Sequence, residues 1–493
     1  MNRATLVATL TALPSPEGKE ILALPKEVKW LEVRADLTGD LDIAWLRNRF
    51  QGRLLYALRS RQEGGHFEGT RQQRLQHLYR AAQDYDLIEL EGARDILPEL
   101  LNKLPPERRL ISSYGSAKDF QQLHTQFEQL SRVEARFYKL LPTAVRADDG
   151  LAPLLLLKIL GRRDVIAFAD GLRGFWTRLL MPHLGAPMIF GTVTEELNNL
   201  NTVSISRLIE DYGLPALSPV KELFGIVGNS IYYSLSPRLH NAAYRTLDKP
   251  ALYIPFHTDH FTDFYDKIVR NKALEKLGFS LQGLTITSPH KEVAIENVNR
   301  ISPMVQKVNA TNLIIRTENG WMAHTTDHEG IMGPLRQQNI QVKSKRAAVI
   351  GCGGAGRAVA AALTEAGAQV TLVNRGWKRG ENAARLLKLP FVPLPDFSVQ
   401  DFSLIVNAIP GSRDNNKQLF ELNGLKEEAV VSDFIYGITS SPLISNAKTR
   451  GLMTIDGYAV LRAQVERQFF MMTGQEMPKT VTDDFFKAKK ETI

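Results

Sequence analysis

One glycine-rich stretch constrains the fold more than any other part of the chain. The apolar run Ala347 to Ile350 leads directly into Gly351-Cys-Gly353-Gly354-Ala355-Gly356, and an alanine-rich run then ends at Gly367. A strand, a glycine turn and a helix in this order form a dinucleotide-binding loop, because glycines let the backbone approach a pyrophosphate closely. The helix N-terminus then offers free N–H groups and a partial positive charge to the phosphates.

The end of the next strand indicates which dinucleotide binds. A second apolar run, Gln369 to Val373, ends in Asn374-Arg375. An NAD site usually carries an acidic residue at this place, where it binds the ribose hydroxyls. An arginine there, with Lys378 and Arg379 close behind, suits a 2′-phosphate instead. The sequence therefore predicts an NADP site; the alternative is a glycine turn beside a solvated basic loop.

Length and charge limit the remaining possibilities. A chain of 493 residues is too long for one ordinary core, so we expect two or three domains. The net charge of +8 suits anionic small-molecule substrates and a phosphorylated cofactor as well as it suits nucleic acid. No basic tract interleaved with aromatic residues favours nucleic acid, so we expect none as a partner.

The cysteine content and the apolar segments indicate the compartment. Cys352 is the only cysteine, which excludes a disulfide framework or a cysteine metal cluster and predicts a cytoplasmic location. The segment Met1 to Leu13 lacks the apolar core of a signal peptide. The run Leu154 to Leu157 is too short to span a bilayer, so we expect no membrane partner.

Short apolar runs alternate with helix-like runs over the first half of the chain. The helix-like runs include Thr70–Gln83, Asp119–Leu130 and Ala152–Leu160. Eight strands, each followed by a helix, predict a (β/α)₈ barrel over residues 1–215. The eight apolar runs are Thr5–Leu10, Trp30–Arg34, Leu54–Leu58, Leu87–Leu90, Leu110–Ser113, Arg136–Leu140, Val165–Ala169 and Met188–Phe190.

A barrel of this kind works at the C-terminal ends of its strands. Charged residues gather at these predicted ends, which indicates a polar pocket that accepts an anion. They are Glu32, Arg34, Arg59, Glu89 and Lys139, with Arg178 further on.

Lys139 is the most informative of these residues. Apolar residues flank it, and desolvation lowers the pKa of a lysine, so that its neutral amine can attack a ketone. The alternative is a lysine paired with Glu89 or Glu32, and the residues alone leave both open.

Several of these segments resemble the type I 3-dehydroquinate dehydratases: Glu32-Val-Arg34-Ala-Asp36, Arg59-Ser with Glu63-Gly-Gly, Phe137-Tyr-Lys139, and Arg178. The resemblance implies that Lys139 forms an imine with the ketone of 3-dehydroquinate. The imine acidifies the neighbouring C–H, and water is lost by syn elimination. Glu32, Arg34, Arg59 and Arg178 would bind the hydroxyls and the carboxylate.

The barrel also departs from that family. A histidine usually follows the serine-rich end of the fifth strand as general base and acid, but here Ser112-Ser-Tyr114 is followed by Gly115. His66 is the nearest candidate replacement; the alternative is an ordinary loop histidine. Asn201 stands where the family has a glutamine. The barrel is thus a re-equipped dehydratase, a weak one, or a scaffold that only binds.

A proline-rich stretch, Gly213 to Pro219, predicts a linker, and a new strand begins at Leu223. Polar motifs follow: Ser234-Leu-Ser236-Pro, Thr287 with Lys291, Asn312, and Thr325-Thr-Asp327. Lysine and aspartate in one cleft can act as a proton-transfer pair beside a hydroxyl that is oxidised.

These motifs, together with the glycine loop, resemble the shikimate dehydrogenases. The resemblance implies that Ser234 and Ser236 hold the substrate carboxylate and that Lys291 and Asp327 form the catalytic pair. The other substrate-binding residues would be Thr287, Asn312, Tyr436 and Gln464. The residues that bind NADP would be Gly351, Gly353, Gly354, Ala355, Gly356, Asn374, Arg375, Arg379, Asn407 and Gly457.

The whole chain is therefore expected to be α/β: a (β/α)₈ TIM barrel fused to a two-domain dehydrogenase. The substrate domain would cover residues 222–328, completed by 455–493, and a Rossmann NADP domain would cover 329–454. The resemblance implies a metal-free bifunctional enzyme of the shikimate pathway. Two alternatives are an active dehydrogenase with a silent barrel and a quinate dehydrogenase. The sequence leaves the oligomeric state open.

Overall fold

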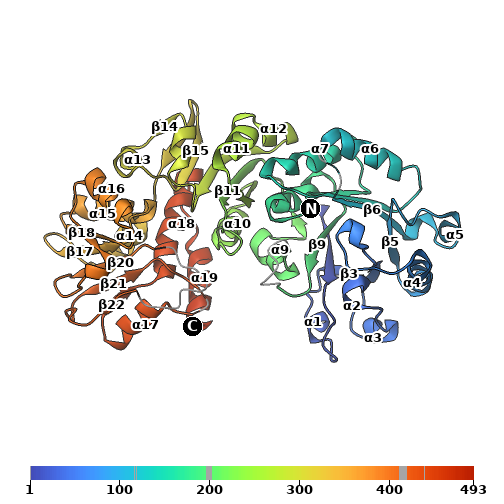
Figure 1. The fold of residues 1–493 in the computed structure, drawn as a ribbon, viewed down its shortest axis with the longest axis horizontal. Coiled ribbons are helices and arrows are strands. Elements are labelled where there is room, and N and C mark those ends of the chain that lie inside the picture. The colour runs from blue at the N-terminus through green and yellow to red at the C-terminus, as the bar shows by residue number, and fades with distance from the viewer. Residues whose placement is uncertain are drawn as a thin grey trace. The chain divides into compact units, whose positions relative to one another are not determined.

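The computed structural model describes residues 2–115, 117, 119–195, 202–409, 419–437 and 439–492, so Asn201 lies outside the described residues. The chain divides into two compact units (Figure 1). The first unit contains Met1–Leu223, Asn229–Ala242 and Pro250–Leu281. The second contains Phe224–Gly228, Ala243–Lys249 and Gln282–Ile493.

An eight-stranded parallel sheet forms the core of the first unit, and it curls into a nearly closed barrel. Its order is β8-β7-β6-β5-β4-β3-β2-β9, so each strand pairs with its neighbours in sequence and β9 returns to β2. The predicted barrel is confirmed, and the predicted strand ends differ by a few residues at most. The strands are β2 Thr5–Leu10, β3 Val28–Arg34, β4 Arg53–Ala57, β5 Leu87–Glu91, β6 Arg109–Gly115, β7 Phe137–Pro142, β8 Val165–Ala167 and β9 Met188–Thr192.

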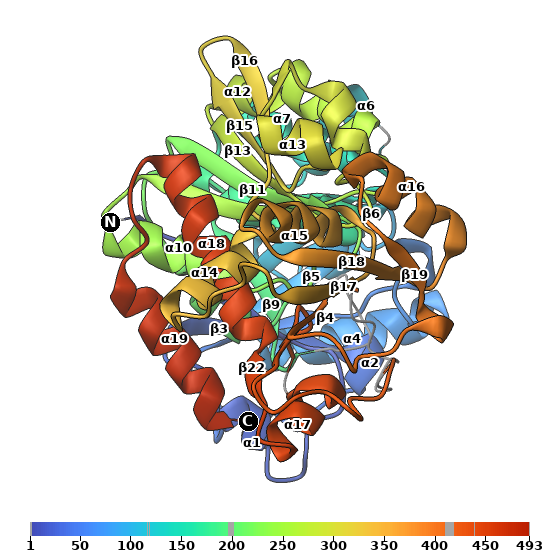
Figure 2. The same cartoon turned by 90° about the vertical axis from the view of Figure 1, so that its left-hand side faces the viewer.

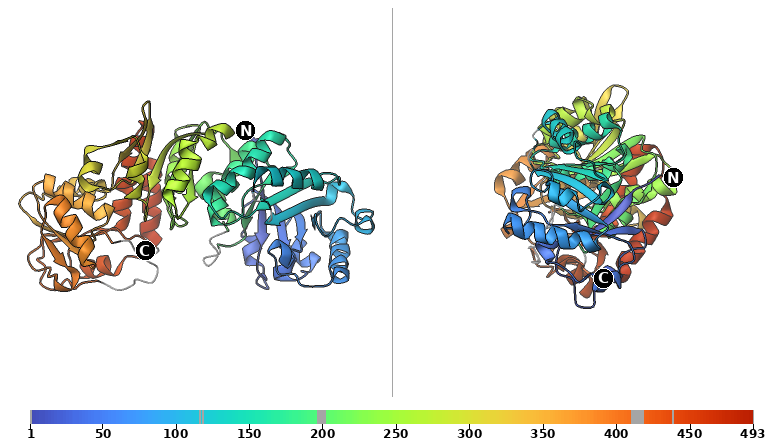
Figure 3. Two further views of the ribbon diagram at one scale, coloured as in Figure 1. Left: turned by 45° about the horizontal axis from the view of Figure 1, so that its top comes forward. Right: turned by 90° about the vertical axis from the view of Figure 1, so that its right-hand side faces the viewer.

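Helices connect these strands and lie outside them (Figure 3). The Thr70 hydroxyl accepts the Gln73 N–H while the Gln73 side chain accepts the Thr70 N–H, and this capping box starts one helix at Arg71. Asp119 caps another by accepting the Gln122 N–H. The helices are α1 Lys19–Leu22, α2 Ala35–Thr38, α3 Ile43–Arg47, α4 Arg71–Asp84, α5 Pro98–Leu101, α6 Phe120–Leu130, α7 Leu151–Leu160, α8 Phe175–Leu180 and α9 Ile205–Tyr212.

The predicted linker is tied back to the start of the barrel. Within it β10 (Ala216–Leu217) pairs antiparallel with β1 (Asn2–Arg3), and the Ala4 N–H donates to the Pro215 carbonyl at 3.0 Å. The predicted linker thus contains a short strand that the sequence did not predict. The pairing satisfies backbone groups over two residues only, which is too short to leave a hydrophobic period in the sequence.

The second unit contains two sheets. The first is part of a six-stranded sheet, and its strands in this unit have the order β11-β13-β15-β16-β14, with β15 antiparallel to β13 and β16. Because β13, β15 and β16 are neighbours, the loops at their ends can bring polar residues together. The strands are β11 Glu222–Gly228, β13 Ser280–Ile286, β14 Arg300–Ile301, β15 Leu313–Thr317 and β16 Gly320–His324.

The other sheet is parallel and has the order β19-β18-β17-β20-β21-β22. Figure 2 labels β17, β18, β19 and β22 of this sheet. This order reverses between β17 and β20, as in doubly wound dinucleotide-binding folds, so the predicted Rossmann topology is confirmed. The strands are β17 Arg346–Ile350, β18 Gln369–Asn374, β19 Phe391–Pro393, β20 Leu404–Asn407, β21 Val430–Asp433 and β22 Met453–Ile455.

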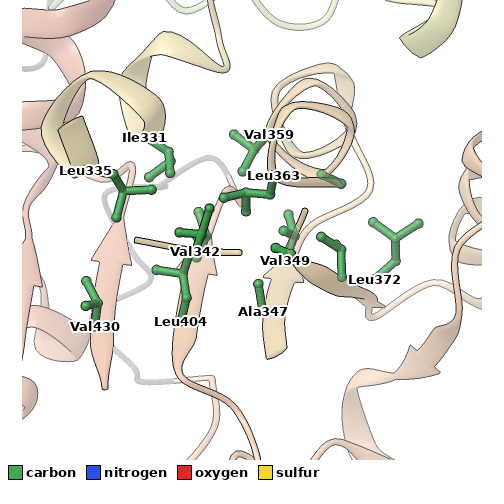
Figure 4. Packing of buried hydrophobic residues seen from close by; sticks show 14 of the residues in the cluster. Ile331, Leu335, Val342, Ala347, Val349, Val359, Leu363, Leu372, Leu404 and Val430 are labelled. Carbon is green, nitrogen blue, oxygen red and sulfur yellow. The ribbon is translucent and has the colours of Figure 1, made fainter. Parts of the chain in front are cut away.

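Two helices pack on one face of this sheet (Figure 4). Ile331 comes from α14 (Glu329–Gln337) and Leu363 from α15 (Gly354–Glu365), and both lie over the side chains of β17, β20 and β21. This packing fixes the start of α15 directly beyond the end of β17. Further helices of the unit are α13 Pro303–Val308, α16 Trp377–Leu387, α17 Pro442–Thr449, α18 Gly457–Thr473 and α19 Lys479–Thr492.

Candidate active sites

Lys139 lies in the middle of the barrel, on β7, and only 2% of it is exposed. Its Nζ lies 3.2 Å from Oε1 of Glu32 on β3 and 3.1 Å from Oε2 of Glu89 on β5. The Thr9 hydroxyl donates to the other oxygen of Glu32 at 2.6 Å. The barrel therefore brings together three of the charged residues that the sequence placed at its strand ends.

The charge of Lys139 differs from the one expected from its apolar neighbours in sequence. Burial alone would lower the pKa of Lys139, but the carboxylates of Glu32 and Glu89 outweigh burial and raise it. The resting amine is therefore an ammonium ion. Of the two alternatives that the residues left open, the structure shows the lysine paired with Glu32 and Glu89, because the barrel surrounds Lys139 with groups from other strands.

Tyr114 joins this cluster from β6. Its hydroxyl donates to Oε1 of Glu89 at 2.6 Å and accepts from Nη2 of Arg59 at 2.6 Å. The Arg59 guanidinium also lies over the tyrosine ring, 3.7 Å from its centre. Sequence reasoning missed Tyr114, although alternation along the strand places it on the same face as Ser112, the residue paired with Lys139.

Two arginines near Lys139 form no ion pair with any residue that the structure describes. Nε of Arg59 and Nε of Arg178 are buried without a hydrogen-bond partner among these residues. Arg178 lies on α8, 9% exposed, and donates through Nη1 to the Phe190 carbonyl at 3.2 Å. Burial lowers the pKa of Arg178, and the charges of Asp170 and Glu32 only partly oppose this effect. Both guanidinium groups suit a carboxylate ligand.

The remaining barrel candidates lie at the rim. Arg34 forms a two-point ion pair with Asp36, with Nε to Oδ1 at 2.8 Å and Nη2 to Oδ2 at 2.7 Å. Asp36 also accepts the backbone N–H of His66 at 3.0 Å, and His66 itself is exposed. The structure therefore places Arg34 in a local pair and the His66 ring toward solvent, whereas Tyr114 is buried beside Lys139.

The second unit contains another lysine–carboxylate pair. Nζ of Lys291 lies 2.8 and 2.6 Å from the two oxygens of Asp327, a residue that is 3% exposed. Oδ1 of Asp327 also accepts from Asn312 at 3.0 Å and from Gln464 of α18 at 3.2 Å. This network fixes the carboxylate, which in turn holds the ammonium group in one position.

The local structure explains how these residues meet. Lys291 follows β13, Asn312 precedes β15, and Asp327 follows β16, three strands that are adjacent in the sheet. The Thr311 N–H donates to the Lys291 carbonyl at 2.8 Å. Half-buried Thr287 directly follows β13, and its N–H donates to the Val227 carbonyl at 3.0 Å.

Tyr436, Ser234 and Ser236 are the other residues predicted to bind the substrate. Tyr436 is 36% exposed, and its ring centre lies 5.9 Å from that of Tyr458. Ser234 and Ser236 belong to the first unit, at the start of α10 (Ser236–Thr246), where the Ser236 N–H donates to the Ser234 hydroxyl at 3.3 Å.

Several glycines of the loop leave no room for a side chain, because other atoms lie too close to them. A Cβ on Gly356 would lie 1.7 Å from the Gly351 carbonyl oxygen, and Gly351 itself has a φ of +104°. A Cβ on Gly354 would lie 3.3 Å from Cδ of Lys291, so the start of α15 lies against the lysine–aspartate pair. The loop, with Gly353 and Ala355 at the free N–H groups of α15, fits a pyrophosphate.

Polar residues also lie at the end of β18 and directly after it. Oδ1 of Asn374 accepts the Cys352 N–H at 3.1 Å, and the neighbouring Arg375 is exposed. Arg379 is exposed as well, and its Nη2 lies 2.7 Å from Oε1 of Glu292. Both cations follow β18, the position at which a 2′-phosphate would bind.

Two further candidates hold the backbone at the strand ends. Nδ2 of Asn407 donates to Oδ1 of Asp433 at 3.0 Å, which ties β20 to β21. A Cβ on Gly457 would lie 2.2 Å from the Ile435 carbonyl oxygen, so only glycine fits there.

The described residues contain neither a cluster of metal ligands nor a helix that could span a membrane. No cluster of three or more histidine, cysteine, aspartate and glutamate residues is arranged there to hold a metal ion. None of the helices described has both the length and the apolarity that crossing a bilayer requires.

Comparison with known proteins matches the two halves of the chain to two different families. Residues 14–214 match the family model for type I 3-dehydroquinase, and residues 226–314 match that for the shikimate dehydrogenase substrate-binding domain. A bifunctional 3-dehydroquinate dehydratase/shikimate dehydrogenase from Arabidopsis thaliana is 25% identical over 91% of this chain and 78% of its own length.

Other relatives match the second half alone. The NADP(+) shikimate dehydrogenase of Pyrococcus furiosus is 31% identical over 52% of this chain and 91% of its own length. A crystal structure of a shikimate dehydrogenase in complex with NADP+ superimposes with a TM-score of 0.50 at 26% identity. It covers 56% of this chain and 99% of that chain.

Proposed function

The chain belongs to the shikimate dehydrogenase family, and from that premise we propose a bifunctional enzyme that carries out two consecutive reactions on one cyclic acid. Its type I 3-dehydroquinase barrel dehydrates 3-dehydroquinate to 3-dehydroshikimate. Its second half reduces that product to shikimate. The proposed domains are the barrel at 1–215, the substrate domain at 222–328 with 455–493, and the cofactor domain at 329–454.

One observation carries this proposal: each half contains a lysine paired with at least one carboxylate, in surroundings that suit its own reaction. Lys139 is buried with Glu32 and Glu89, next to two arginines whose Nε atoms have no hydrogen-bond partner among the described residues. Lys291 pairs with Asp327 and lies against the glycine loop. A buried ammonium ion beside two arginines whose Nε atoms lack a hydrogen-bond partner among the described residues argues against an inert scaffold.

In the barrel, Arg178 and Arg59 bind the substrate carboxylate and hydroxyls while Lys139 attacks the ketone. The ammonium ion must first lose a proton, and Glu32 and Glu89 lie within hydrogen-bond distance to accept it. The amine nitrogen then bonds to the carbonyl carbon, and the carbonyl oxygen leaves as water to give the imine.

In the second half, bound NADPH would supply the hydride. Lys291 donates a proton to the ketone oxygen as it becomes a hydroxyl, and Asp327 orients the lysine. Asn312, Thr287 and Gln464 position the ring hydroxyls, with Tyr436 at the edge of the site. Ser234 and Ser236 hold the carboxylate.

The cofactor proposal is specifically NADP rather than NAD. Arg375 and Arg379 follow β18, where cations suit a 2′-phosphate, and the matched relatives in the second half are named as NADP(+) enzymes. The single cysteine is buried in this loop, which suits a reducing compartment, and we propose a cytoplasmic location.

Trapping distinguishes the two sites. Borohydride added with 3-dehydroquinate should leave an adduct on Lys139, seen by peptide mass spectrometry, in a protein that also turns the substrate over. An adduct without turnover would support a barrel that only binds. Comparing quinate with shikimate, and NADP with NAD, tests the alternative of a quinate dehydrogenase.

A further inference from the structure

One buried hydroxyl is connected to Lys139 through a single carboxylate. Tyr114 is 7% exposed and donates to Oε1 of Glu89, while Oε2 of Glu89 lies 3.1 Å from Nζ of Lys139. The centre of the tyrosine ring lies 5.5 Å from the same nitrogen. A substrate carbon bonded to Lys139 would therefore stand close to the phenol oxygen.

The reaction needs a group in this place. Once an imine forms on Lys139, water is eliminated only if one proton leaves carbon and one reaches the departing hydroxyl. His66 is exposed on the loop after β4 and lies outside the buried cluster. Glu63 is the main competitor, because burial and the charges of Glu91 and Glu89 raise its pKa to about 8.

We propose that Tyr114 is the proton-transfer residue of the barrel and that Glu89 holds the phenol proton while the tyrosine oxygen is in use. This inference rests on the dehydratase function proposed above. As the C–H bond beside the imine carbon breaks, its proton passes to the Tyr114 oxygen and the phenol proton passes to Glu89. The electron pair of that bond forms the enamine double bond.

The second half of the cycle reverses the proton transfers. Glu89 returns its proton to the Tyr114 oxygen, and the other phenol proton passes to the substrate hydroxyl as its C–O bond breaks. Water leaves with the bonding electrons, the imine is conjugated, and hydrolysis releases the product and the free amine of Lys139. Every proton taken up is given back, and no oxidant or metal is required.

The electrostatics of the resting site agree with this sequence. Burial raises the pKa of Tyr114, with the Arg59 charge partly opposing it, so the residue begins as a neutral phenol. Burial would also raise the pKa of Glu89, but Lys139 and Arg59 lower it to about 2, so the carboxylate begins ready to accept a proton. Arg59 donates to the phenol oxygen and stabilises the phenolate character that develops during transfer.

Tyr114→Phe tests the proposal, because it removes the hydroxyl and keeps the ring beneath Arg59. Dehydration should fall about 100- to 10,000-fold. The borohydride adduct should still form on Lys139, with the mass of bound substrate rather than the mass lighter by one water. NADPH-linked reduction of 3-dehydroshikimate should stay at the wild-type rate, which shows that the chain folds.

Matched variants complete the test. Tyr56→Phe removes another buried barrel hydroxyl, one that donates to Asp40 at 2.7 Å, and should leave dehydration unchanged. Tyr114→His, which supplies another proton-transfer group, should recover part of the lost rate. Tyr114→Phe with near wild-type turnover, or a loss confined to Glu63→Gln, would overturn the inference. Wild-type protein with neither adduct nor turnover would instead contradict the dehydratase proposal itself.

Discussion

The ammonium group of Lys139 and the carboxylate of Glu89 lie 3.1 Å apart in a part of the barrel almost closed to water. Such a pair is stable only with both charges present, so the resting site stores a protonated lysine. The lysine must lose its proton before it attacks a ketone, and the charges around it therefore control the first chemical step.

Glu32→Gln should make Lys139 reactive at lower pH. The substitution removes a negative charge 3.2 Å from Nζ, so the raised pKa of Lys139 should fall. The rate of borohydride trapping, followed against pH, should therefore rise at lower pH than in the wild type.

Glu68→Gln is the matched control, because Glu68 forms an exposed ion pair with Arg61 on the loop after β4. It should leave the trapping profile in place. A Glu32→Gln profile that coincides with the wild type, or moves to higher pH, would show that Glu32 does not hold the lysine in its charged form.

Arg178→Gln should weaken substrate binding more than it slows the chemistry. Arg178 is buried with Nε unpartnered among the described residues, and a charged hydrogen bond to a carboxylate contributes about 1.5 to 3 kcal/mol. KM for 3-dehydroquinate should rise about 10- to 100-fold. Arg162→Gln, which breaks an exposed pair with Asp164, should leave KM unchanged, and equal effects of both variants would refute the assignment.

Glu292→Gln should tighten cofactor binding. The carboxylate of Glu292 holds Arg379 at 2.7 Å, and a bound 2′-phosphate would have to take the arginine from it. The pair is exposed and worth about 0.2 to 1 kcal/mol, so Kd for NADPH should fall by about two- to fivefold at most. Kd for NADH should stay constant. Glu365→Gln is the control, because it breaks an exposed ion pair with Lys307, and it should change neither Kd for NADPH nor Kd for NADH. Weaker NADPH binding in Glu292→Gln would argue against the role of Arg379.

The sequence predicted most of the framework because local patterns determine it. Each of the eight barrel strands appears as an apolar run, and the glycines from Gly351 to Gly356 mark a turn that only small residues can form. The charge of Lys139 and the contacts of Tyr114 depend on side chains from other strands, which no local window contains. The pairing of β10 with β1 likewise joins the two ends of the barrel sequence.

The absorbance of NADPH during incubation with 3-dehydroquinate tests the central claim most directly. The wild-type chain should oxidise NADPH, because the barrel forms 3-dehydroshikimate and the second half reduces it. Lys139→Ala should show no oxidation with 3-dehydroquinate but normal oxidation when 3-dehydroshikimate is added, whereas Lys291→Ala should show little with either compound. Oxidation that persists in Lys139→Ala with 3-dehydroquinate, or that is missing from the wild type, would contradict the account.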